Sequence, residues 1–258
     1  MRGLAAGASA IAAAALLAGA AHAAAVPVDL STWDFDRYDA TTADWAVQGP
    51  GNDAVFQSIN GSPTVFFGPG NAQGTALSGK ITVTGSGDDD FIGFVLGYHD
   101  NDLSNTNPNY LLIDWKAADQ GGYFGCTSQA GLSISRVTTN IDLDSEPPWC
   151  HDLGVTELQR AATLADTGWV HGVEYSFDIG FTATHVTVSV NGNQELNISG
   201  SFADGSFGFY NYSQANVLYS AITQEDLPPS TGVPEPATLA LFGAGLLGLG
   251  VARRRKRG

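Results

Sequence analysis

Residues 87–98 read Gly-Asp-Asp-Asp-Phe-Ile-Gly-Phe-Val-Leu-Gly-Tyr, and residues 110–116 read Tyr-Leu-Leu-Ile-Asp-Trp-Lys. The bulky side chains of the first stretch occupy every second position: Ile92, Phe94, Leu96 and Tyr98. This is the period of a β-strand that buries one face. The same alternation in the second stretch turns Leu111, Ile113 and Trp115 inward. The two stretches therefore predict neighbouring strands of an antiparallel sheet with these side chains in the core.

The outer face of this strand pair has a different character. Glycines at 93 and 97 leave the first strand shallow on that face, while the second strand presents long side chains there: Tyr110, Asp114 and Lys116. We expect either a flat ligand or a covering loop on this surface, and we take these three residues as a possible ligand face.

Short apolar segments recur along the middle of the chain between clusters of Gly, Asn, Asp and Pro. This density of turns predicts an all-β fold, a two-sheet antiparallel jelly-roll sandwich. Residues 156–164 fit either a helix or a bent strand. In the hairpin of residues 185–199, an Asn191-Gly192 turn would place Glu195 opposite Val188. We expect a three-residue loop, 191–193, because it places Leu196 there and avoids burying an unpaired carboxylate.

Both ends of the chain look like targeting signals. Arg2, an Ala-rich apolar run and Ala21-His22-Ala23 predict a signal peptide over residues 1–24, with an uncleaved anchor as the alternative. At the other end, Pro234-Glu235-Pro236 precedes an apolar run over 237–252 and a basic cluster at 253–257. This run is a candidate transmembrane helix, with its basic end on the cytoplasmic side.

The C-terminal pattern resembles the PEP-CTERM sorting signal of Gram-negative bacteria. The resemblance implies that an exosortase recognises Pro234, Glu235 and Pro236 and removes the tail, after transient anchoring in the inner membrane. A plain tail anchor is the alternative reading. We therefore expect a signal peptide at 1–24, a sandwich at 25–222, a linker at 223–232 and a sorting signal at 233–258.

The part between the signals is strongly acidic. Residues 25–232 carry 25 acidic and 5 basic side chains, a net charge of −20. Nucleic acid is bound through clustered Lys and Arg, so this composition argues against a nucleic-acid partner. Export favours a disulfide between Cys126 and Cys150 over two free thiols.

The middle segment resembles the thrombospondin C-terminal domain. The matching pieces occur in order: residues 87–98, 110–116 and 131–134, then Gly168-Trp169, Tyr175 with Phe177, 205–209 and 212–214. The resemblance implies a lectin-like jelly roll, bound calcium, and adhesion or matrix binding without catalysis. The loop 99–109 and the segment around the two cysteines depart from the family pattern.

Two acidic clusters flank the first strand: Asp88-Asp89-Asp90 before it, and Asp100-Asn101-Asp102 after it. Calcium prefers such hard oxygen ligands, so both clusters are candidate calcium sites. Aspartate is also common in turns, which is the alternative for each cluster. An eight-residue strand spans about 26 Å, so a straight strand keeps the clusters too far apart to share one ion.

Catalytic patterns are weak. The sequence has no Gly-x-Ser-x-Gly elbow, its histidines lack paired metal-ligand spacing, and Glu157, Glu174 and Glu195 are isolated. A surface ion pair explains Asp114 with Lys116. We expect an exported, non-enzymatic calcium-binding module that binds a polysaccharide or a protein at the cell envelope. A carbohydrate-active enzyme on the same scaffold and a structural matrix protein without a soluble ligand are the alternatives.

Overall fold

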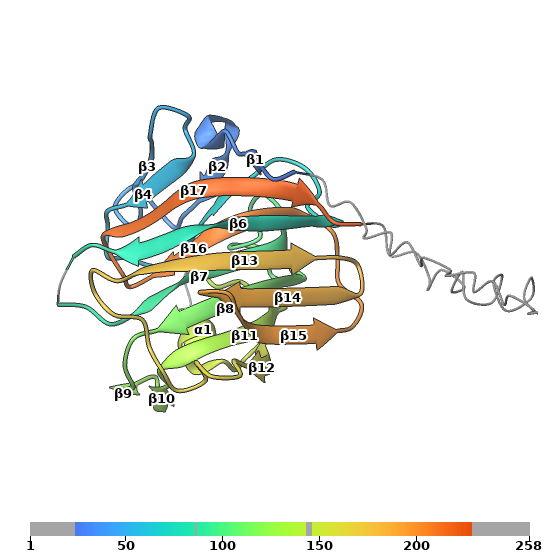
Figure 1. Cartoon of the computed structure of the whole chain (residues 1–258). Coiled ribbons are helices and arrows are strands. Elements are labelled where there is room, and N and C mark those ends of the chain that lie inside the picture. Colours follow the sequence, from blue (N-terminus) through green and yellow to red (C-terminus); the bar gives the residue numbers. More distant parts are fainter. Residues whose placement is uncertain (1–23, 86, 143–145, 229–258) are drawn as a thin grey trace, which may run out of the picture.

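The computed structural model describes residues 24–85, 87–142 and 146–228. Two antiparallel sheets lie face to face (Figure 1). Sheet A contains, in spatial order, β15 (Asn193–Ser199), β14 (His185–Val190), β13 (Glu174–Phe181), β6 (Thr75–Val83), β17 (Val217–Asp226), β4 (Ala54–Gln57) and β3 (Trp45–Gln48), with β1 (Val26–Pro27) also paired to β17. Sheet B contains β12 (Val155–Arg160), β11 (Gly131–Val137), β8 (Tyr110–Lys116), β7 (Phe91–Tyr98), β16 (Ser206–Tyr212), β5 (Thr64–Phe67) and β2 (Asp34–Asp36). The predicted two-sheet sandwich is confirmed.

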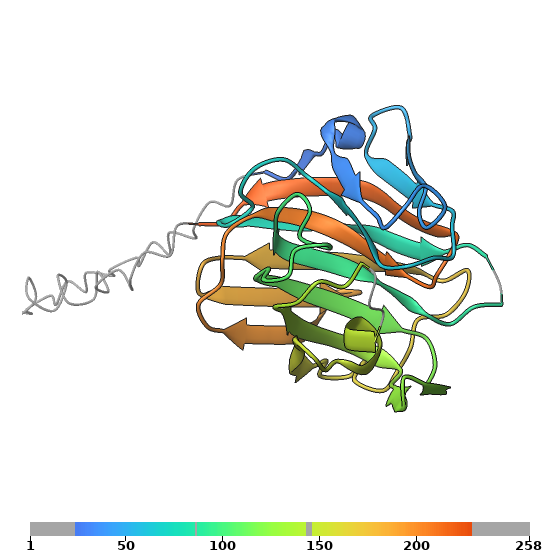
Figure 2. The same cartoon turned by 180° about the vertical axis from the view of Figure 1, so that it is seen from behind.

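Four short elements lie outside the two sheets. A 3₁₀ turn, η1 (Leu30–Thr32), follows β1, and a small hairpin joins β9 (Gln120–Tyr123) to β10 (Cys126–Ser128). The helix α1 (Glu146–Cys150) lies on the outer side of sheet B, in front of its strands in the view of Figure 2. Residues 156–160, for which a helix was one expectation, belong to the strand β12.

The core between the sheets contains the side chains that the alternation turned inward. Ile92, Phe94 and Leu96 from β7 are buried there with Leu111, Ile113 and Trp115 from β8. Removal of each such side chain from water contributes about 1.5–3 kcal/mol. This prediction from the alternation is confirmed for those six residues.

Tyr98 is the exception to the predicted alternation. Its side chain belongs to a second hydrophobic cluster, and its ring packs edge-on against Tyr110 with centroids 5.1 Å apart. The pairing of β7 with β16 shifts between Ser206 and Phe207, and Gly97 adopts a positive φ of 73°. The resulting bend breaks the period of two, and Tyr98 moves to the opposite side of the sheet.

The second cluster fills the outer face of sheet B, where loops and α1 cover the strands (Figure 2). Its members come from the strands and from the covering segments: Val65, Phe67, Phe91, Val95, Tyr98, Leu103, Tyr110, Leu112, Val137, Ile141, Trp149, Val155, Tyr210 and Tyr212. Of the two expectations for this face, the covering loop is therefore the one observed. Tyr110, Asp114 and Lys116 are each at most 2% exposed.

The hairpin of β14 and β15 corrects one expectation and confirms another. Val188 pairs with Leu196 and Val186 with Ile198, as expected, but Val190 pairs with Asn193, so the loop contains only Asn191 and Gly192. A bulge between Val188 and Ser189 restores the register, which makes Glu195 the extra residue of β15. The carboxylate of Glu195 is buried and accepts hydrogen bonds from the backbone and hydroxyl of Thr163.

The predicted boundaries differ from the structure at one end. Residues 223–226, expected in the linker, form the end of β17. The signal peptide and the sorting signal, including Pro234, Glu235, Pro236 and the expected membrane helix, lie outside the described residues. Within the three described ranges, no helix is both long and apolar enough to cross a lipid bilayer.

Candidate functional site

A buried ammonium lies at the centre of the covered face. Lys116 is fully buried, and its Nζ donates to Asp90 Oδ1 at 2.5 Å, Gln120 Oε1 at 2.9 Å and the Asp89 carbonyl at 3.2 Å. The same ammonium lies 4.8 Å from the ring centroid of Trp149. The expected surface pair of Asp114 with Lys116 is wrong, because both side chains are buried and each has other partners.

The first acidic cluster adjoins this lysine. Oxygens of Asp88, Asp89 and Asp90 lie within 4.8 Å of one another. Burial and the neighbouring Asp90 charge raise the pKa of Asp88, and Asn60 Nδ2 donates to its carboxylate. Lys116 offsets one of three negative charges, so the cluster retains carboxylate oxygens of the kind that calcium prefers.

The second acidic cluster has the geometry of a turn. Asp102 is buried and accepts hydrogen bonds from the His99 backbone at 3.0 Å and from Asn105 Nδ2 at 3.0 Å. Asn101 has a positive φ of 66°, and its N–H donates to Asp36. The described residues do not bring Asp100 and Asp102 into a group of three acidic, cysteine or histidine ligands, whereas Asp88–Asp90 form one.

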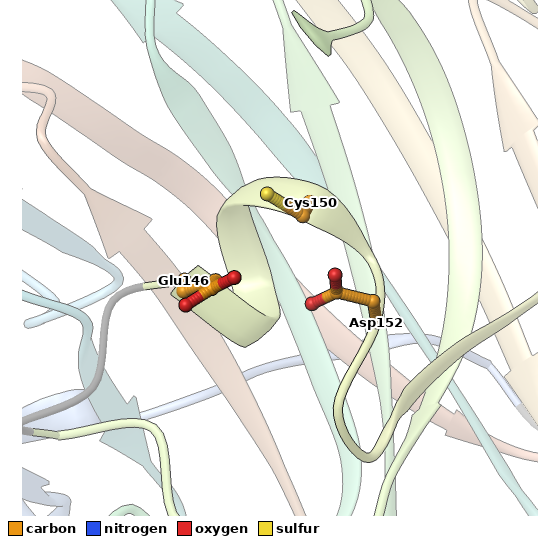
Figure 3. A group of neighbouring side chains, drawn as sticks. All are labelled: Glu146, Cys150 and Asp152. Atoms are coloured by element: carbon orange, nitrogen blue, oxygen red, sulfur yellow. The ribbon is translucent and has the colours of Figure 1, made fainter. Parts of the chain in front are cut away.

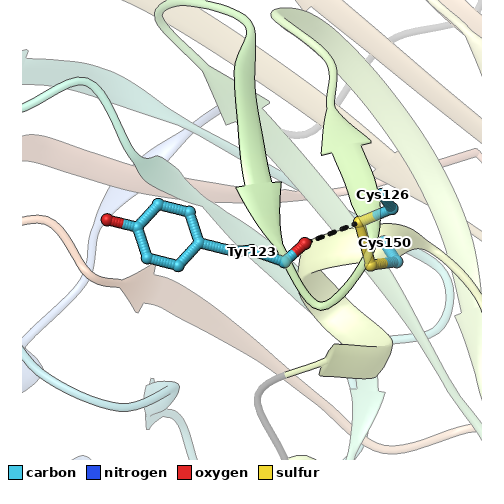
Figure 4. The surroundings of a disulfide bond; sticks show 3 residues. All are labelled: Tyr123, Cys126 and Cys150. Carbon is cyan, nitrogen blue, oxygen red and sulfur yellow. Dashed lines mark hydrogen bonds between the residues drawn. A yellow bond between two sulfur atoms is a disulfide. The ribbon is translucent and has the colours of Figure 1, made fainter.

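Glu146, Cys150 and Asp152 also lie close together (Figure 3). Cys150 is joined to Cys126 by the predicted disulfide, with Cα atoms 5.9 Å apart (Figure 4). A disulfide sulfur is not the thiolate that binds metals, so this group is not a metal site. The disulfide instead connects β10 to α1, and it thereby fixes the covering segments on sheet B.

A pocket of about 280 Å³ opens beside the disulfide. Its walls come from β7, the end of β10, α1 and β12, and they include Phe91, Ser128, Trp149, His151, Glu157 and Arg160. Residues more than 60 positions apart in the chain therefore meet at one hollow on the covered face.

A chain of ionic contacts forms one side of this pocket. His151 Nε2 lies 2.8 Å from buried Asp114 Oδ2, and Nδ1 lies 3.3 Å from Glu157 Oε2. Burial on its own lowers the pKa of His151, but the charge of Asp114 and the hydrogen bonds to Asp114 and Glu157 outweigh it and raise the pKa to about 10. The hydrogen bond from His151 lowers the pKa of Glu157, which also accepts from Arg160 Nε at 3.1 Å. His151 is therefore charged at neutral pH.

Sequence patterns did not identify this constellation. Asp114, His151 and Glu157 lie on β8, on the segment after α1 and on β12, so no spacing in the chain relates them. The position of His151 beside a disulfide-bonded cysteine was the one available signal.

The fold and its covered face define a lectin-like β-sandwich, and known proteins share this architecture. The carbohydrate-binding module CBM66 from Bacillus subtilis superposes with a TM-score of 0.53 at 10% identity, covering 76% of this chain and 96% of that one. The lumenal domain of VIP36 in its Ca²⁺/Man-bound form gives a TM-score of 0.51 at 12% identity, covering 78% of this chain and 86% of that one.

The sequence comparisons are more specific. The model of the thrombospondin C-terminal region matches residues 40–226, and the chain belongs to this family. Thrombospondin-1 of Xenopus laevis is 23% identical over 225 residues, which cover 77% of this chain and 18% of that relative. The PEP-CTERM protein-sorting motif matches residues 232–256, which indicates an exported protein sorted by an exosortase at the cell envelope.

Proposed function

We propose that this protein is a non-enzymatic, calcium-binding adhesion module that binds a polysaccharide or a protein at the cell envelope. The observation that carries the calcium proposal is the charge imbalance at Asp88–Asp90, where three carboxylates lie together and the ammonium of Lys116 pairs with two of them, Asp89 and Asp90. A divalent cation on Asp88 and Asp89 would relieve the repulsion between the carboxylates. The Ca²⁺-bound form named for the VIP36 domain is consistent with this reading.

Glycan binding is supported by the fold relatives, since one is a carbohydrate-binding module and another is described with Man bound. Fold alone does not assign function, so this remains part of the proposal. In the cell, we propose transient anchoring in the inner membrane of a Gram-negative bacterium, with exosortase cleavage at Pro234-Glu235-Pro236 and a cleaved signal peptide.

The chemistry of the pocket argues against the enzyme alternative. A glycosidase needs one carboxyl group that stays protonated near neutral pH to act as the general acid. Glu157 has a lowered pKa, and Asp114 is buried between His151 and Ser133. Release of reducing ends from an exopolysaccharide would instead support the enzyme.

Calcium binding is tested by thermal unfolding and calorimetric titration of the EDTA-treated, full-length chain. We expect calcium to release or absorb heat and to raise the Tm of the wild type. The double variant Asp88→Asn/Asp89→Asn should lose both effects. The matched control Glu225→Gln/Asp226→Asn removes two neighbouring acidic charges at the end of β17 and should keep both effects.

A wild type that gives no heat and no Tm shift would overturn the calcium proposal. Glycan binding is tested separately on columns of immobilised exopolysaccharides, with and without EDTA. Retention of the protein on a column without release of reducing ends supports a non-enzymatic module that binds glycans. Retention that persists in EDTA would show that glycan binding does not depend on calcium.

A further inference from the structure

A groove of about 450 Å³ opens where the edge strands of the two sheets meet. β15 is the edge strand of sheet A and β12 that of sheet B (Figure 1), and the N–H of Asn197 on β15 donates to Gln159 Oε1 on β12 at 2.9 Å. The volume lies within the ~300–1,000 Å³ typical of ligand sites. Asn197 and Ser199, which line the groove, are exposed, so the groove is open to solvent.

A bulge in β12 adds an apolar side chain to the wall of this groove. The pairing of β12 with β11 shifts at Leu158, which is the extra residue of the bulge. Bulges redirect side chains, and Leu158 is 42% exposed and lines the groove together with Ile198 and Phe202. The polar side chains of Asn197 and Ser199 lie in the same lining. The groove therefore offers apolar surface for the C–H groups of a ligand and polar groups for its hydroxyls.

Arg136 carries the positive charge of the groove. It follows Leu132 and Ile134 at every second position of β11, and those two side chains lie in the core between the sheets. The guanidinium therefore lies at the end of a row of core side chains, where it is half-buried. Its central carbon is 5.9 Å from the ring centroid of Phe202.

This guanidinium has no carboxylate partner within the described ranges. Arg136 donates only to uncharged oxygens, Asn109 Oδ1 at 3.0 Å and the Ser201 carbonyl at 3.1 Å. Three of the five basic side chains in residues 25–232 contact a carboxylate at 2.5–3.1 Å: those of Lys80, Lys116 and Arg160. Among the described residues that line the groove, none is Asp or Glu. A guanidinium has five N–H donors in a planar fork that matches a carboxylate, so Arg136 keeps donors for an anionic ligand.

The backbone at this edge is already paired, which disfavours an added peptide strand. The N–H of Asn197 donates to Gln159, and the carbonyl of Glu195 accepts from the N–H of Ala162 at 2.9 Å. A peptide that extends a sheet needs such groups unpaired. The side-chain amide of Asn197, in contrast, makes no hydrogen bond within the part of the chain that the structure describes. It is available to the hydroxyls of a sugar.

From these observations we infer that the groove between β12 and β15 binds one carboxylate-bearing sugar ring of an acidic polysaccharide, such as a hexuronate. Arg136 holds the carboxylate, and Asn197 and Ser199 form hydrogen bonds with the ring hydroxyls. Repulsion from the net charge of −20 confines such a ligand to this groove, where the local charge is positive. The inference rests on the proposed function and adds a site and a class of sugar to its glycan-binding part. Because Asp88–Asp90 take no part, binding in the groove does not need calcium.

The test is an NMR titration of the ¹⁵N-labelled, full-length chain in mild detergent and EDTA with methyl glucuronide and methyl galacturonide. The neutral methyl glucoside and methyl galactoside are the matched ligands. The variant Arg136→Lys identifies the Nε signal of Arg136. At least one uronide should shift that signal and bind about tenfold or more tightly than its neutral counterpart.

Two variants and a matched control locate the binding. Arg136→Gln should weaken binding of that uronide about ten- to hundredfold, because a charge-assisted pair is lost, and Asn197→Ala about three- to tenfold. The control is Arg37→Gln, beyond β2 at the opposite edge of sheet B. Arg37 is also half-buried, lies 4.9 Å from the ring centroid of Phe35 and donates to the Ala43 carbonyl. Its replacement should leave binding unchanged.

Several results would overturn the inference. If a uronide binds while the Arg136 signal stays fixed and Arg136→Gln binds normally, this groove is not its site. If the neutral sugars bind as tightly as the uronides, or a glutamate-containing tripeptide binds more tightly than both uronides, the ligand class is wrong. If no uronide shifts any signal at millimolar concentration, the inference fails. Retention of the protein on a column of neutral exopolysaccharide would then show that the proposed function stands without it.

Discussion

Lys116 Nζ lies 2.5 Å from Asp90 Oδ1, and both side chains are buried beneath the segments that cover sheet B. The alternation of β8 points Lys116 away from the inter-sheet core, and α1 then closes over it. Lys116 thus supplies part of the positive charge that offsets the carboxylates of Asp88–Asp90.

Replacement of Lys116 by Met should destabilise the protein by about 3–5 kcal/mol, because Asp90 would be left buried without its partner. Urea unfolding in EDTA measures the change without rescue by added calcium. The double variant Asp90→Asn/Lys116→Met should recover much of the loss. The control is Lys80→Met on the exposed face of sheet A, where the pair with Glu174 is about half-exposed. Its expected cost is below about 1 kcal/mol, and equal losses for the two lysines would contradict the prediction.

The pair of His151 with Asp114 should make stability depend on pH in the alkaline range. The pKa of His151 is about 10 in the folded chain and about 6.5 in an unfolded one, so the folded state holds the proton more tightly. The stabilisation is present in full below pH 6.5. It declines above that pH by up to about 1.4 kcal/mol per unit and is lost above about pH 10. Urea unfolding of the wild type and of His151→Gln at pH 6, 8 and 10 measures this contribution to the free energy of unfolding. The prediction is wrong if the difference in stability between the two proteins does not shrink as the pH rises.

The disulfide should stabilise the covering segments more than the sandwich. Cys126 and Cys150 are 24 residues apart, for which loop closure contributes about 3 kcal/mol. Cys126→Ser/Cys150→Ser should therefore lower the Tm while the far-UV dichroism keeps its β-sheet character. Hydrogen exchange should increase most in β9, β10 and α1. Uniform loss of protection in both sheets would show that the disulfide supports the entire fold instead.

Tyr219 connects the two sheets through its hydroxyl group. It extends from β17 in sheet A to sheet B, where Gly93 N–H donates to it at 3.2 Å and its O–H reaches the Tyr210 carbonyl at 2.8 Å. Tyr219→Phe should cost about 1–3 kcal/mol, because buried backbone groups lose a partner while the ring remains. Tyr175→Phe, at a half-buried hydroxyl that accepts only from the Val170 N–H, is the control and should cost less. The denaturant midpoints of the two variants, compared with that of the wild type, measure the two losses in stability.

The sequence predicted the sandwich and most of its buried faces because alternation is a local property of each strand. Six core side chains illustrate this, since their inward direction follows the pleat: Ile92, Phe94, Leu96, Leu111, Ile113 and Trp115. The prediction failed where the backbone leaves that period, at Gly97–Tyr98 and at the bulge of Glu195. The position of a bulge depends on how a strand pairs with its neighbour, and the alternation within one strand carries no information about that pairing.

The candidate site was predictable only in part. The disulfide followed from export and cysteine number, and the acidic cluster was visible as adjacent residues. The contacts of His151 with Asp114 and Glu157, and the burial of Lys116, depend on how β9, β10, α1 and residues 151–154 lie against sheet B. These contacts are long-range, and no spacing in the sequence encodes them.

The pairing of β1 with β17 brings the first and last described strands together, with Val26 opposite Gln224. β17 is also the longest strand of sheet A and pairs with β6 and β4 along its length (Figure 1). A pull transmitted from the C-terminal side would act along this strand and load its hydrogen bonds together, in shear, instead of opening them one after another. A module fastened to the envelope through that end would consequently withstand mechanical force at its point of attachment.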